Sequence, residues 1–376
     1  MSTDYVSLDP SDHYLLEPFS SENPLAAKLF LTCSGEYIQA ARIQSGLLHK
    51  GIEKVAESKT WYQNIFLSER VDSYSSAFYQ LAFCQSVERL SGIQIPKRAQ
   101  RMRLILCELL RIAEHFRHLS EIAKALEHFT ARHYFLRERE TILDLLELLT
   151  GTRFNHSYFR FGGIHQDVTE GFIERVSDLC RNTLDRLEEH KKVFLNNPTI
   201  KSRTGKFAVI GYDEARAEAL TGPCGRAAGL SYDVRERFPY LEYALFEVRT
   251  VMGRGLLGAR GDAYDRIHVR FDEIYGSLYL LSQATQRIPS GETLAFRADN
   301  SFSPPEGFAY SRVEGPRGEI ICAVFSDGGV MPARVAWKTP SQNLVRVFER
   351  AAVGTSVFRL SELAVSLDIS FQEVDL

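Results

Sequence analysis

Residues 99–126 read AQRMRLILCELLRIAEHFRHLSEIAKAL, and this stretch decides the fold class. Its apolar residues recur every three to four positions, which is the spacing of one face of an α-helix. Pro96 stands just before the stretch and is a typical helix-start signal. The pattern predicts a long amphipathic helix that packs one face into a sizeable core.

Shorter helices and a few strands are expected on either side of this helix. We predict helices over residues 47–60, 141–149, 170–194, 262–288 and 342–352. Strands are predicted over residues 28–33 and 36–43, joined as a hairpin across Ser34-Gly35, and over residues 319–325 and 333–338. Residues 1–24 and 290–310 show little periodicity and are expected to be irregular.

The predicted fold class is therefore α+β, mainly α. A bundle of long helices lies between a small N-terminal β element and a C-terminal β/α element. We expect one compact unit in three segments. These are residues 1–60 (tail, hairpin and first helix), 61–290 (helical core) and 291–376 (C-terminal segment).

Composition excludes several classes of protein. The 376 residues carry a net charge of -3 without a basic run, so nucleic acid is not an expected partner. The six cysteines are scattered, which fits a reducing compartment and cysteines that pack in the core. The N-terminus does not resemble a signal peptide, and no apolar run of about 18 residues predicts a membrane-spanning helix. At a membrane, this chain would therefore depend on membrane-spanning partners.

Motifs of free-standing enzymes are missing from the sequence. Gly253-Arg254-Gly255 lacks the strand-turn-helix context of a dinucleotide site. His115 and His118 stand three apart on the long helix, which is compatible with a shared metal ion. No cysteine or acid completes an obvious ligand set, so a solvated or hydrogen-bonded face is the favoured interpretation.

The segment GPCGRAAGLSYDVR (222–235) combines glycines with charged residues. Glycine lets backbone approach closely, and Arg226, Asp233 and Arg235 stand among small residues. This composition suits buried ion pairs that position a loop. It predicts either a purely structural pairing or a functional site, and composition alone does not separate the two.

Several longer motifs carry a family resemblance from about residue 24 to residue 376. They are GLLHKGIEK (46–54), RVD (70–72), AFCQSVER (82–89), RERETILDL (137–145), RFNHSYFRFGGIHQD (153–167), the segment 222–235, GDAYDR (261–266) and GPRGE (315–319). In order and spacing they resemble the large subunit shared by respiratory complex I, where it lines the quinone chamber, and by energy-converting nickel-iron hydrogenases.

The resemblance implies a role within a larger assembly. Such a subunit packs against a small iron-sulfur subunit that holds a [4Fe–4S] cluster, beside other peripheral-arm subunits and antiporter-like membrane subunits. It binds no cofactor alone, although a quinone is a possible ligand. The implied location is peripheral, on the cytoplasmic side of the inner (plasma) membrane. The implied activity belongs to the assembly, as an NADH-quinone oxidoreductase-like translocase, with NADH oxidised by other subunits.

The chain departs from the hydrogenase branch at the metal ligands. That branch holds nickel and iron with four thiolates in two C-x-x-C pairs, because soft sulfur ligands suit these metals. The corresponding residues here are Asp72, Ser75, Ser370 and Glu373. We therefore expect no metal site and no hydrogenase activity.

The chain also departs from the complex I branch. Ser73 stands at the place of the quinone-binding tyrosine, Pro24 near that of the quinone-pairing histidine, Ala125 at that of its aspartate partner, and Asn155 at that of the cluster-proximal histidine. Quinone reduction needs two protons and nearby hydrogen-bond donors. Either other groups substitute for the lost donors or the site no longer reduces quinone.

Neighbouring residues are the candidate substitutes. His49, Tyr74 and His156 are the predicted catalytic residues. The residues predicted to face the partner or its cluster are Lys50 (an arginine in the family), Asp72, Arg153, His165 and Arg226. The alternative is a non-catalytic scaffold paralogue of a hydrogenase-related, ion-translocating complex, in which this site has decayed.

Overall fold

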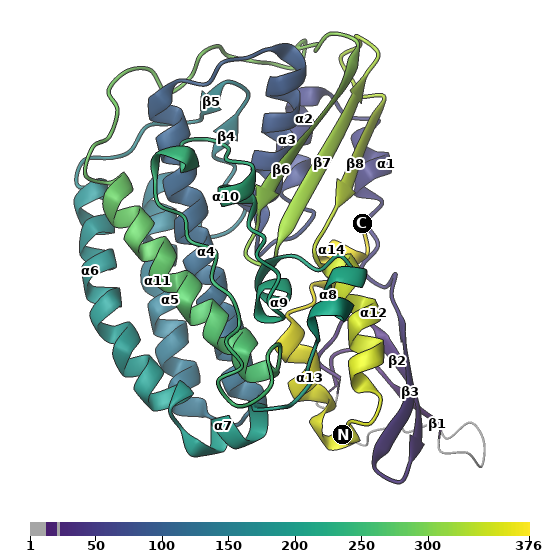
Figure 1. Ribbon diagram of the computed structural model, residues 1–376. Helices are drawn as coiled ribbons and strands as arrows, with labels where there is room; N and C mark the ends of the chain where they lie inside the picture. Colours follow the sequence, from purple (N-terminus) through teal and green to yellow (C-terminus); the bar gives the residue numbers. More distant parts are fainter. Residues whose placement is uncertain (1–12, 21–22) are drawn as a thin grey trace.

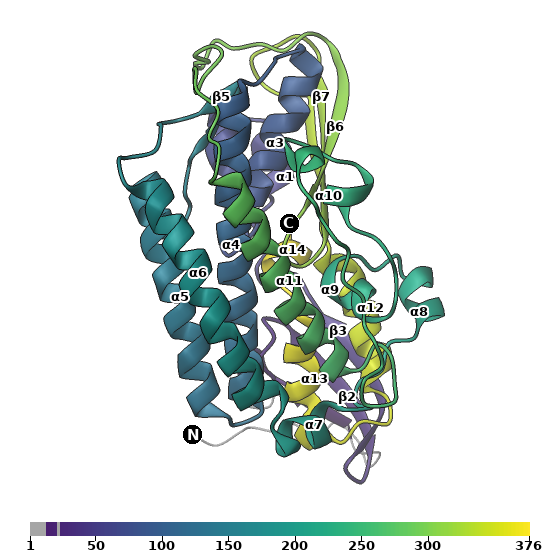
Figure 2. The same ribbon diagram turned by 60° about the vertical axis from the view of Figure 1, so that its left-hand side comes forward.

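A computed structural model describes residues 13–20 and 23–376. As predicted, the fold is α+β and mainly α (Figure 1). The long helices α4 (Lys97–Ala125), α5 (Phe129–Thr150), α6 (Phe172–His190) and α11 (Ala263–Ala284) lie side by side. Figure 2 shows α4 between the pair α5 and α6 and the remainder of the molecule. The helix bundle is therefore the largest part of the fold, and the sheets lie beside it.

Helix α4 confirms the predicted long helix but is more deeply buried than an amphipathic surface helix. Its apolar stripe is buried, and charged side chains on its other faces, such as Arg103, Glu108 and Arg111, are buried as well. Each of these three takes part in an ion pair, as a buried charge requires. The helix is therefore the centre of the molecule.

Two three-stranded antiparallel sheets flank the bundle. The N-terminal sheet joins β1 (His13–Leu16), β2 (Lys28–Ser34) and β3 (Tyr37–Gln44), and packs on α12 (Ser341–Ala352). The C-terminal sheet joins β6 (Gly307–Glu314), β7 (Glu319–Ser326) and β8 (Arg334–Lys338), and packs on α3 (Ser76–Ser91). A short ladder pairs β4 (Phe159–Arg160) with β5 (Gly163–Ile164).

The remaining helices are short. They are α1 (Ile52–Ala56), α2 (Trp61–Ser68), α7 (Pro198–Thr204), α8 (Tyr212–Ala217), α9 (Gly222–Ala227), α10 (Val234–Arg237), α13 (Leu360–Leu367) and α14 (Phe371–Val374). A π-helical turn, Lys191–Leu195, extends α6, and two 3₁₀ turns span Tyr243–Leu245 and Val357–Arg359.

Several predicted boundaries were wrong, and strand pairing over long range or a local turn explains most of them. Residues 307–310, expected in a loop, begin β6, which pairs with β7 along its whole length. Residues 13–16, expected to be irregular, form β1 against β2, whereas residues 1–12 and 21–22 of that segment lie outside the described residues. The helix expected over 47–60 is confined to α1, because Gly51 has a φ of 61°. The helix expected over 141–149 begins earlier, at Phe129.

The first and last segments of the chain share one hydrophobic core. Leu29 and Ile38 of the N-terminal sheet pack in the same cluster as Val347 and Leu363 from the C-terminal helices. The Ile43 amide also donates a hydrogen bond of 2.8 Å to Glu349 Oε1. None of the helices in the described part of the chain combines the length and hydropathy that a bilayer span requires.

Candidate functional site

The four positions that correspond to metal-binding cysteines come together around the guanidinium group of Arg317. Its Nη1 donates hydrogen bonds to Asp72 Oδ2 and Ser75 Oγ, both at 2.9 Å, and to Glu373 Oε1 at 3.4 Å. The Ser370 hydroxyl completes the group by donating to Asp72 Oδ1 at 2.8 Å. We name these five residues the Arg317 centre.

The electrostatics of the Arg317 centre follow from two carboxylates that share one buried cation. Burial by itself would raise the pKa of Asp72, but Arg317 and the hydrogen bonds from Ser370 and Ser75 lower it below its usual value. Burial raises the pKa of Glu373 to about 7 against the attraction of Arg317, and the Asp72 charge adds to this rise. Near neutral pH, Asp72 is therefore the ionised carboxylate, and Glu373 is the carboxyl of the pair that takes up a proton as the pH falls through about 7.

The donor set of the Arg317 centre does not fit a nickel-iron site. Hydroxyl and carboxylate oxygens replace the four thiolates, and soft metals prefer sulfur. A guanidinium group also lies among these oxygens and makes hydrogen bonds to three of the four side chains. Among the described residues, no group of three or more His, Cys, Asp or Glu side chains is arranged to hold a metal ion.

Close backbone approach holds Arg317 in place. It lies in the turn between β6 and β7, and the Gly222 backbone at the start of α9 packs against this turn. A Cβ atom on Gly222 would lie 2.1 Å from the Arg317 carbonyl oxygen, and the φ of Gly222 is 65°. Only glycine fits both constraints. The GPCGR segment and the GPRGE segment are therefore two halves of one structural unit.

A chain of buried ion pairs extends from the Arg317 centre along α4 and α11. Arg317 Nε lies 3.6 Å from Asp368 Oδ1, and Asp368 Oδ2 lies 3.0 Å from Arg270 Nη2. Arg270 Nη1 is 3.1 Å from His115 Nδ1, and His115 Nε2 is 3.0 Å from Glu273 Oε2. Because arginine only donates, His115 Nδ1 accepts and its Nε2 carries the proton. Burial lowers the pKa of His115 to about 4, in agreement with a neutral ring.

These buried contacts also show how the His115 and His118 pair and the 222–235 segment are used. His115 and His118 are buried and hydrogen-bonded, since His118 Nε2 lies 2.7 Å from the Val365 carbonyl oxygen. Arg226 and Asp233 are buried as well, and Arg226 Nη1 lies 2.7 Å from Glu314 Oε1. The 222–235 segment therefore contributes structural ion pairs.

A cavity of about 510 Å³ opens beside the Arg317 centre, and we name it the Tyr74 cavity. It lies between α4, α5, α13 and the segment at Pro24. Its lining includes Pro24, Tyr74, Arg117, His118, Arg139, Phe154 and Asp368. Arg117 stacks on the Tyr74 ring at 4.6 Å, and Arg139 lies over the Phe154 ring at 5.6 Å. The cavity thus combines aromatic faces with cationic groups.

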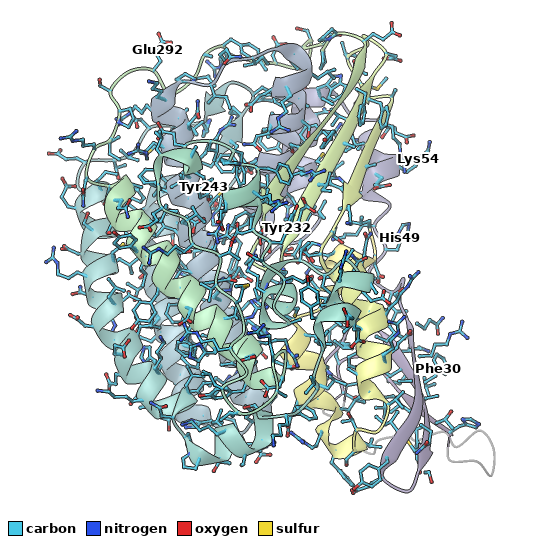
Figure 3. All side chains as sticks on the ribbon, viewed as in Figure 1. Phe30, His49, Lys54, Tyr232, Tyr243 and Glu292 are labelled. Atoms are coloured by element: carbon cyan, nitrogen blue, oxygen red, sulfur yellow. The ribbon has the colours of Figure 1, made fainter. Side chains whose placement is uncertain are left out.

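The three predicted catalytic residues do not share this cavity. Tyr74 lines it, as does Pro24, so the structure places a candidate substitute on the same cavity as one of the positions at which the sequence departs from the family. His49 lies at the outer side of the molecule between the two sheets (Figure 3). His156 is buried, with Nδ1 3.3 Å from the Thr152 carbonyl oxygen, and burial lowers its pKa to about 4.

The residues predicted to face a partner fall into two groups. Lys50 donates to the carbonyl oxygens of Arg70 at 2.6 Å and Val71 at 3.2 Å, next to Asp72. Arg153, which pairs with Glu140, and His165 remain accessible. Asp72 and Arg226 are buried, with exposed fractions of 0% and 1%. Both side chains are engaged in ion pairs inside the chain, and their predicted place opposite a partner or its cluster stays a prediction.

Sequence reasoning missed three residues of the site. Arg317 and Arg139 were visible only as parts of the GPRGE and RERETILDL motifs, and Asp368 was not singled out by any pattern. Their partners are distant in sequence, as Arg317 and Asp72 are 245 residues apart. A sequence pattern could have revealed Arg317 only through Gly315 and Gly318 close to it, since glycine permits close backbone packing.

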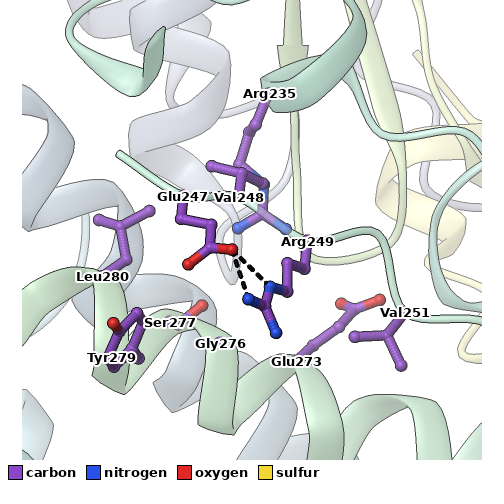
Figure 4. A pocket seen from close by; sticks show the side chains of 10 residues that line it. All are labelled: Arg235, Glu247, Val248, Arg249, Val251, Glu273, Gly276, Ser277, Tyr279 and Leu280. Carbon is purple, nitrogen blue, oxygen red and sulfur yellow. Dashed lines mark hydrogen bonds and ion pairs between the residues drawn. The ribbon is translucent and has the colours of Figure 1, made fainter. Parts of the chain in front are cut away.

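A second cavity, of about 300 Å³, lies on α11 beside the 247–251 segment. Arg249 donates hydrogen bonds to Glu247 across it, at 2.7 and 2.5 Å (Figure 4). Glu273 and Arg235 from the buried ion pairs also line it. Each of these two charges already has carboxylate or guanidinium partners, so this cavity offers no free charged group at its base.

Comparisons with known proteins agree with the fold and with the resemblance. Residues 126–302 and 296–376 match the family described as "Respiratory-chain NADH dehydrogenase, 49 Kd subunit". The chain is 34% identical to a subunit of the NADH-quinone oxidoreductase of Carboxydothermus hydrogenoformans, covering 93% of this chain and 94% of that one. It is 32% identical to a subunit of the F(420)H(2) dehydrogenase of Methanosarcina mazei, covering 96% of each chain.

A solved structure extends the similarity to three dimensions. A chain of the membrane-bound sulfane sulfur reductase, an archaeal respiratory membrane complex, superposes with a TM-score of 0.92 at 29% identity, covering 99% of this chain and 100% of that one. Sequence and fold thus agree over nearly the entire length. The chain belongs to the respiratory-chain NADH dehydrogenase 49 kDa subunit family and is a complex I-like subunit of a membrane-associated respiratory complex.

Proposed function

We propose that this subunit packs against a small iron-sulfur subunit and receives an electron acceptor in the Tyr74 cavity, where electrons from the partner's [4Fe–4S] cluster reduce it. The acceptor is a quinone or a related small molecule. The observation that carries the proposal is the position of the cavity directly beside the Arg317 centre. Asp368 lines the cavity and also lies 3.6 Å from Arg317 Nε.

The chemistry of the cavity supports acceptor binding. Tyr74 is 39% exposed and brings a phenol hydroxyl to a site whose family tyrosine is replaced by Ser73. A phenol can donate a hydrogen bond to a carbonyl group that is being reduced. Burial raises the pKa of Glu373 to about 7, so this carboxyl can take up and release a proton near neutral pH, and Arg317 lies between it and Asp368. The chain thus supplies a hydrogen-bond donor at the cavity wall and a proton reserve behind it.

These relatives differ in what their names say they act on. The Carboxydothermus relative is named for quinone, the Methanosarcina relative for F(420)H(2), and the structural relative for sulfane sulfur. The shared part is a respiratory complex, and the varied part is the donor or acceptor. Since Pro24, Ser73 and Ala125 remove the family's quinone partners, an acceptor other than an ordinary quinone belongs within this proposal.

A second candidate function is that of a non-catalytic scaffold that couples partner subunits mechanically. The same three substitutions favour it, together with the absence of His49 and His156 from the described lining of the Tyr74 cavity. If the subunit is a scaffold, the cavity is the remnant of an acceptor site and Tyr74 is dispensable for electron transfer.

Tyr74→Ala in the intact, purified complex separates the two functions. The proposed function predicts a loss of electron transfer to added acceptors while assembly and iron content remain unchanged. The matched control is Tyr212→Ala, because Tyr212 is an exposed tyrosine on α8 outside the Tyr74 cavity. The His49→Ala variant tests the remaining predicted residue in the same assay.

Equal turnover in all of these variants would support the scaffold and overturn the proposal. Co-purification with an iron-sulfur protein tests the partner, and recovery of the chain without one would count against it. The proposed location, on the cytoplasmic side of the inner (plasma) membrane beside antiporter-like subunits, is tested by protease accessibility in inverted and right-side-out vesicles. Digestion of the chain only in right-side-out vesicles would contradict it.

A further inference from the structure

Arg139 on α5 is a buried guanidinium group without a hydrogen bond in the part of the chain that the structure describes. Its side chain is 10% exposed, and its Nε atom is fully buried and has no partner. The nearest carboxylate oxygen, Glu140 Oε1, lies 3.7 Å from Nη1, beyond hydrogen-bond distance. A buried N–H group without an acceptor is costly, and the two terminal nitrogens of a guanidinium group add four further donors.

Three other arginines on or near the Tyr74 cavity differ in this respect. Arg117 donates to Glu114 at 2.7 Å and to Asp368 at 2.9 Å, and Arg317 donates to Asp72 at 2.9 Å. Arg270 lies 3.0 Å from Asp368. Each of these cations is neutralised inside the chain. Arg139 has the face of the Phe154 ring at 5.6 Å, which orients a guanidinium group without accepting its hydrogen bonds.

The position of Arg139 allows the terminal N–H groups of its guanidinium to meet a ligand in the Tyr74 cavity. Arg139 lines the Tyr74 cavity together with Tyr74 and Phe154. Two carboxylates also line this cavity, Asp368 and Glu121. Asp368 is already surrounded by three arginines, so its charge is balanced without Arg139. Glu121 is the remaining acid of the wall and makes no hydrogen bond or ion pair to Arg139.

We propose that Arg139 is the anion-binding group of the Tyr74 cavity, and that it holds a negatively charged oxygen or sulfur group of the acceptor by charge-assisted hydrogen bonds. This inference rests on the proposed function and adds the class of molecule. The acceptor carries a negative charge at neutral pH, unlike a neutral quinone. An arginine fork suits such a group, because it offers two parallel N–H donors to one anion.

Two classes of ligand carry such an anionic group: inorganic sulfur anions and organic carboxylates. Thiosulfate and malonate are therefore the two probes, and decylubiquinone is the neutral reference. Binding of each to the intact purified complex is measured by isothermal titration calorimetry at low ionic strength. Thiosulfate alone, malonate alone or both should bind to the wild type, and the preferred probe identifies the class.

The variants are Arg139→Gln, Arg139→Lys and the control Arg137→Gln. Arg137 lies two residues away on the same helix, is 57% exposed, pairs with Glu138 and does not line the Tyr74 cavity. Arg139→Gln should weaken anion binding about tenfold or more, the usual loss for hydrogen bonds to a charged group. Arg137→Gln should leave it unchanged. Arg139→Lys keeps the charge without the fork and should bind with intermediate affinity.

Three results would overturn the inference: unchanged anion affinity in Arg139→Gln, equal loss in Arg137→Gln, or a wild-type complex that binds decylubiquinone and neither anion. If Arg139→Gln does not assemble, Arg139→Lys decides, and wild-type affinity in that variant counts against the arginine fork. Electron transfer is measured separately. Anion binding without acceptor turnover would remove the proposed function, whereas turnover of neutral quinone without anion binding would remove only this inference.

Discussion

Arg317 Nη1 lies 2.9 Å from Asp72 Oδ2, and this contact joins a turn of the C-terminal sheet to the segment before α3. Arg317 also lies within 4.0 Å of carboxylate oxygens of Glu114, Asp368 and Glu373. Arg317 thus lies among four buried acids, two of which also pair with other arginines, at the point that corresponds to the metal site of the hydrogenase branch. The fold keeps its charge balance there with an arginine.

Replacing Arg317 by methionine should strongly destabilise the subunit. The change leaves Asp72 buried without its main cation, and breaking a buried ion pair on one side typically costs about 3–5 kcal/mol. The thermal midpoint of the purified complex and the amount of subunit incorporated in it are the measurements. Arg334→Met is the control, because Arg334 is 46% exposed and its pairs with Glu53 and Glu57 are solvated. Similar midpoints for the two variants would contradict the central role of Arg317.

Gly222→Ala should disrupt the Arg317 centre from a distance in sequence. The new Cβ would lie 2.1 Å from the Arg317 carbonyl oxygen, at a φ of 65° that alanine adopts only with strain. We expect a loss of assembly comparable to that of Arg317→Met. Gly276→Ala is the matched control, since Gly276 lies inside α11 with open space at its Cβ position. There, alanine should stabilise the helix by up to about 1 kcal/mol. Normal assembly of Gly222→Ala would refute the packing argument.

Glu373 should make stability fall as the pH rises from about 4.5 to 7. Its pKa is raised to about 7 by burial, so the folded chain holds a proton that the unfolded chain has released. The stability linked to this proton is present below the unfolded pKa and is lost as the pH passes the folded pKa. A shift of this size corresponds to roughly 3 kcal/mol. In Glu373→Gln, the thermal midpoint should therefore decline less between pH 5 and pH 8. Parallel curves for both proteins would show that Glu373 does not hold the proton.

His115 should have the opposite effect at lower pH. Burial lowers its pKa to about 4, so the folded chain keeps the ring neutral while the unfolded chain protonates it near pH 6.5. The stability from this group is present above pH 6.5 and is lost as the pH falls towards 4. His115→Asn cannot be protonated and should lose less stability over that range, as followed by thermal denaturation. A steeper acid decline in the variant would mean that the His115 ring is charged in the folded chain, between Arg270 and Glu273.

The sequence predicted regular elements where one pattern dominated a long stretch. Helix α4 was found from residues 99–126 alone, and the hairpin of β2 and β3 from two β-prone runs across Gly35. Strand β6 was missed because residues 307–310 lack alternation and gain their structure from pairing with β7. The first turns of α5 were missed for a similar reason, since residues 129–140 are dense in charged and aromatic side chains whose partners lie on other elements.

The site shows the same division. The sequence by itself determined the class of the protein, because the order of its motifs and the missing thiolates can be read in one dimension. It also selected Tyr74 and the four positions of the Arg317 centre. Only the tertiary structure decided what fills that centre and which cation of the Tyr74 cavity lacks a hydrogen bond. Ion pairing depends on distances of a few ångströms between groups hundreds of residues apart, and only the folded chain sets such distances.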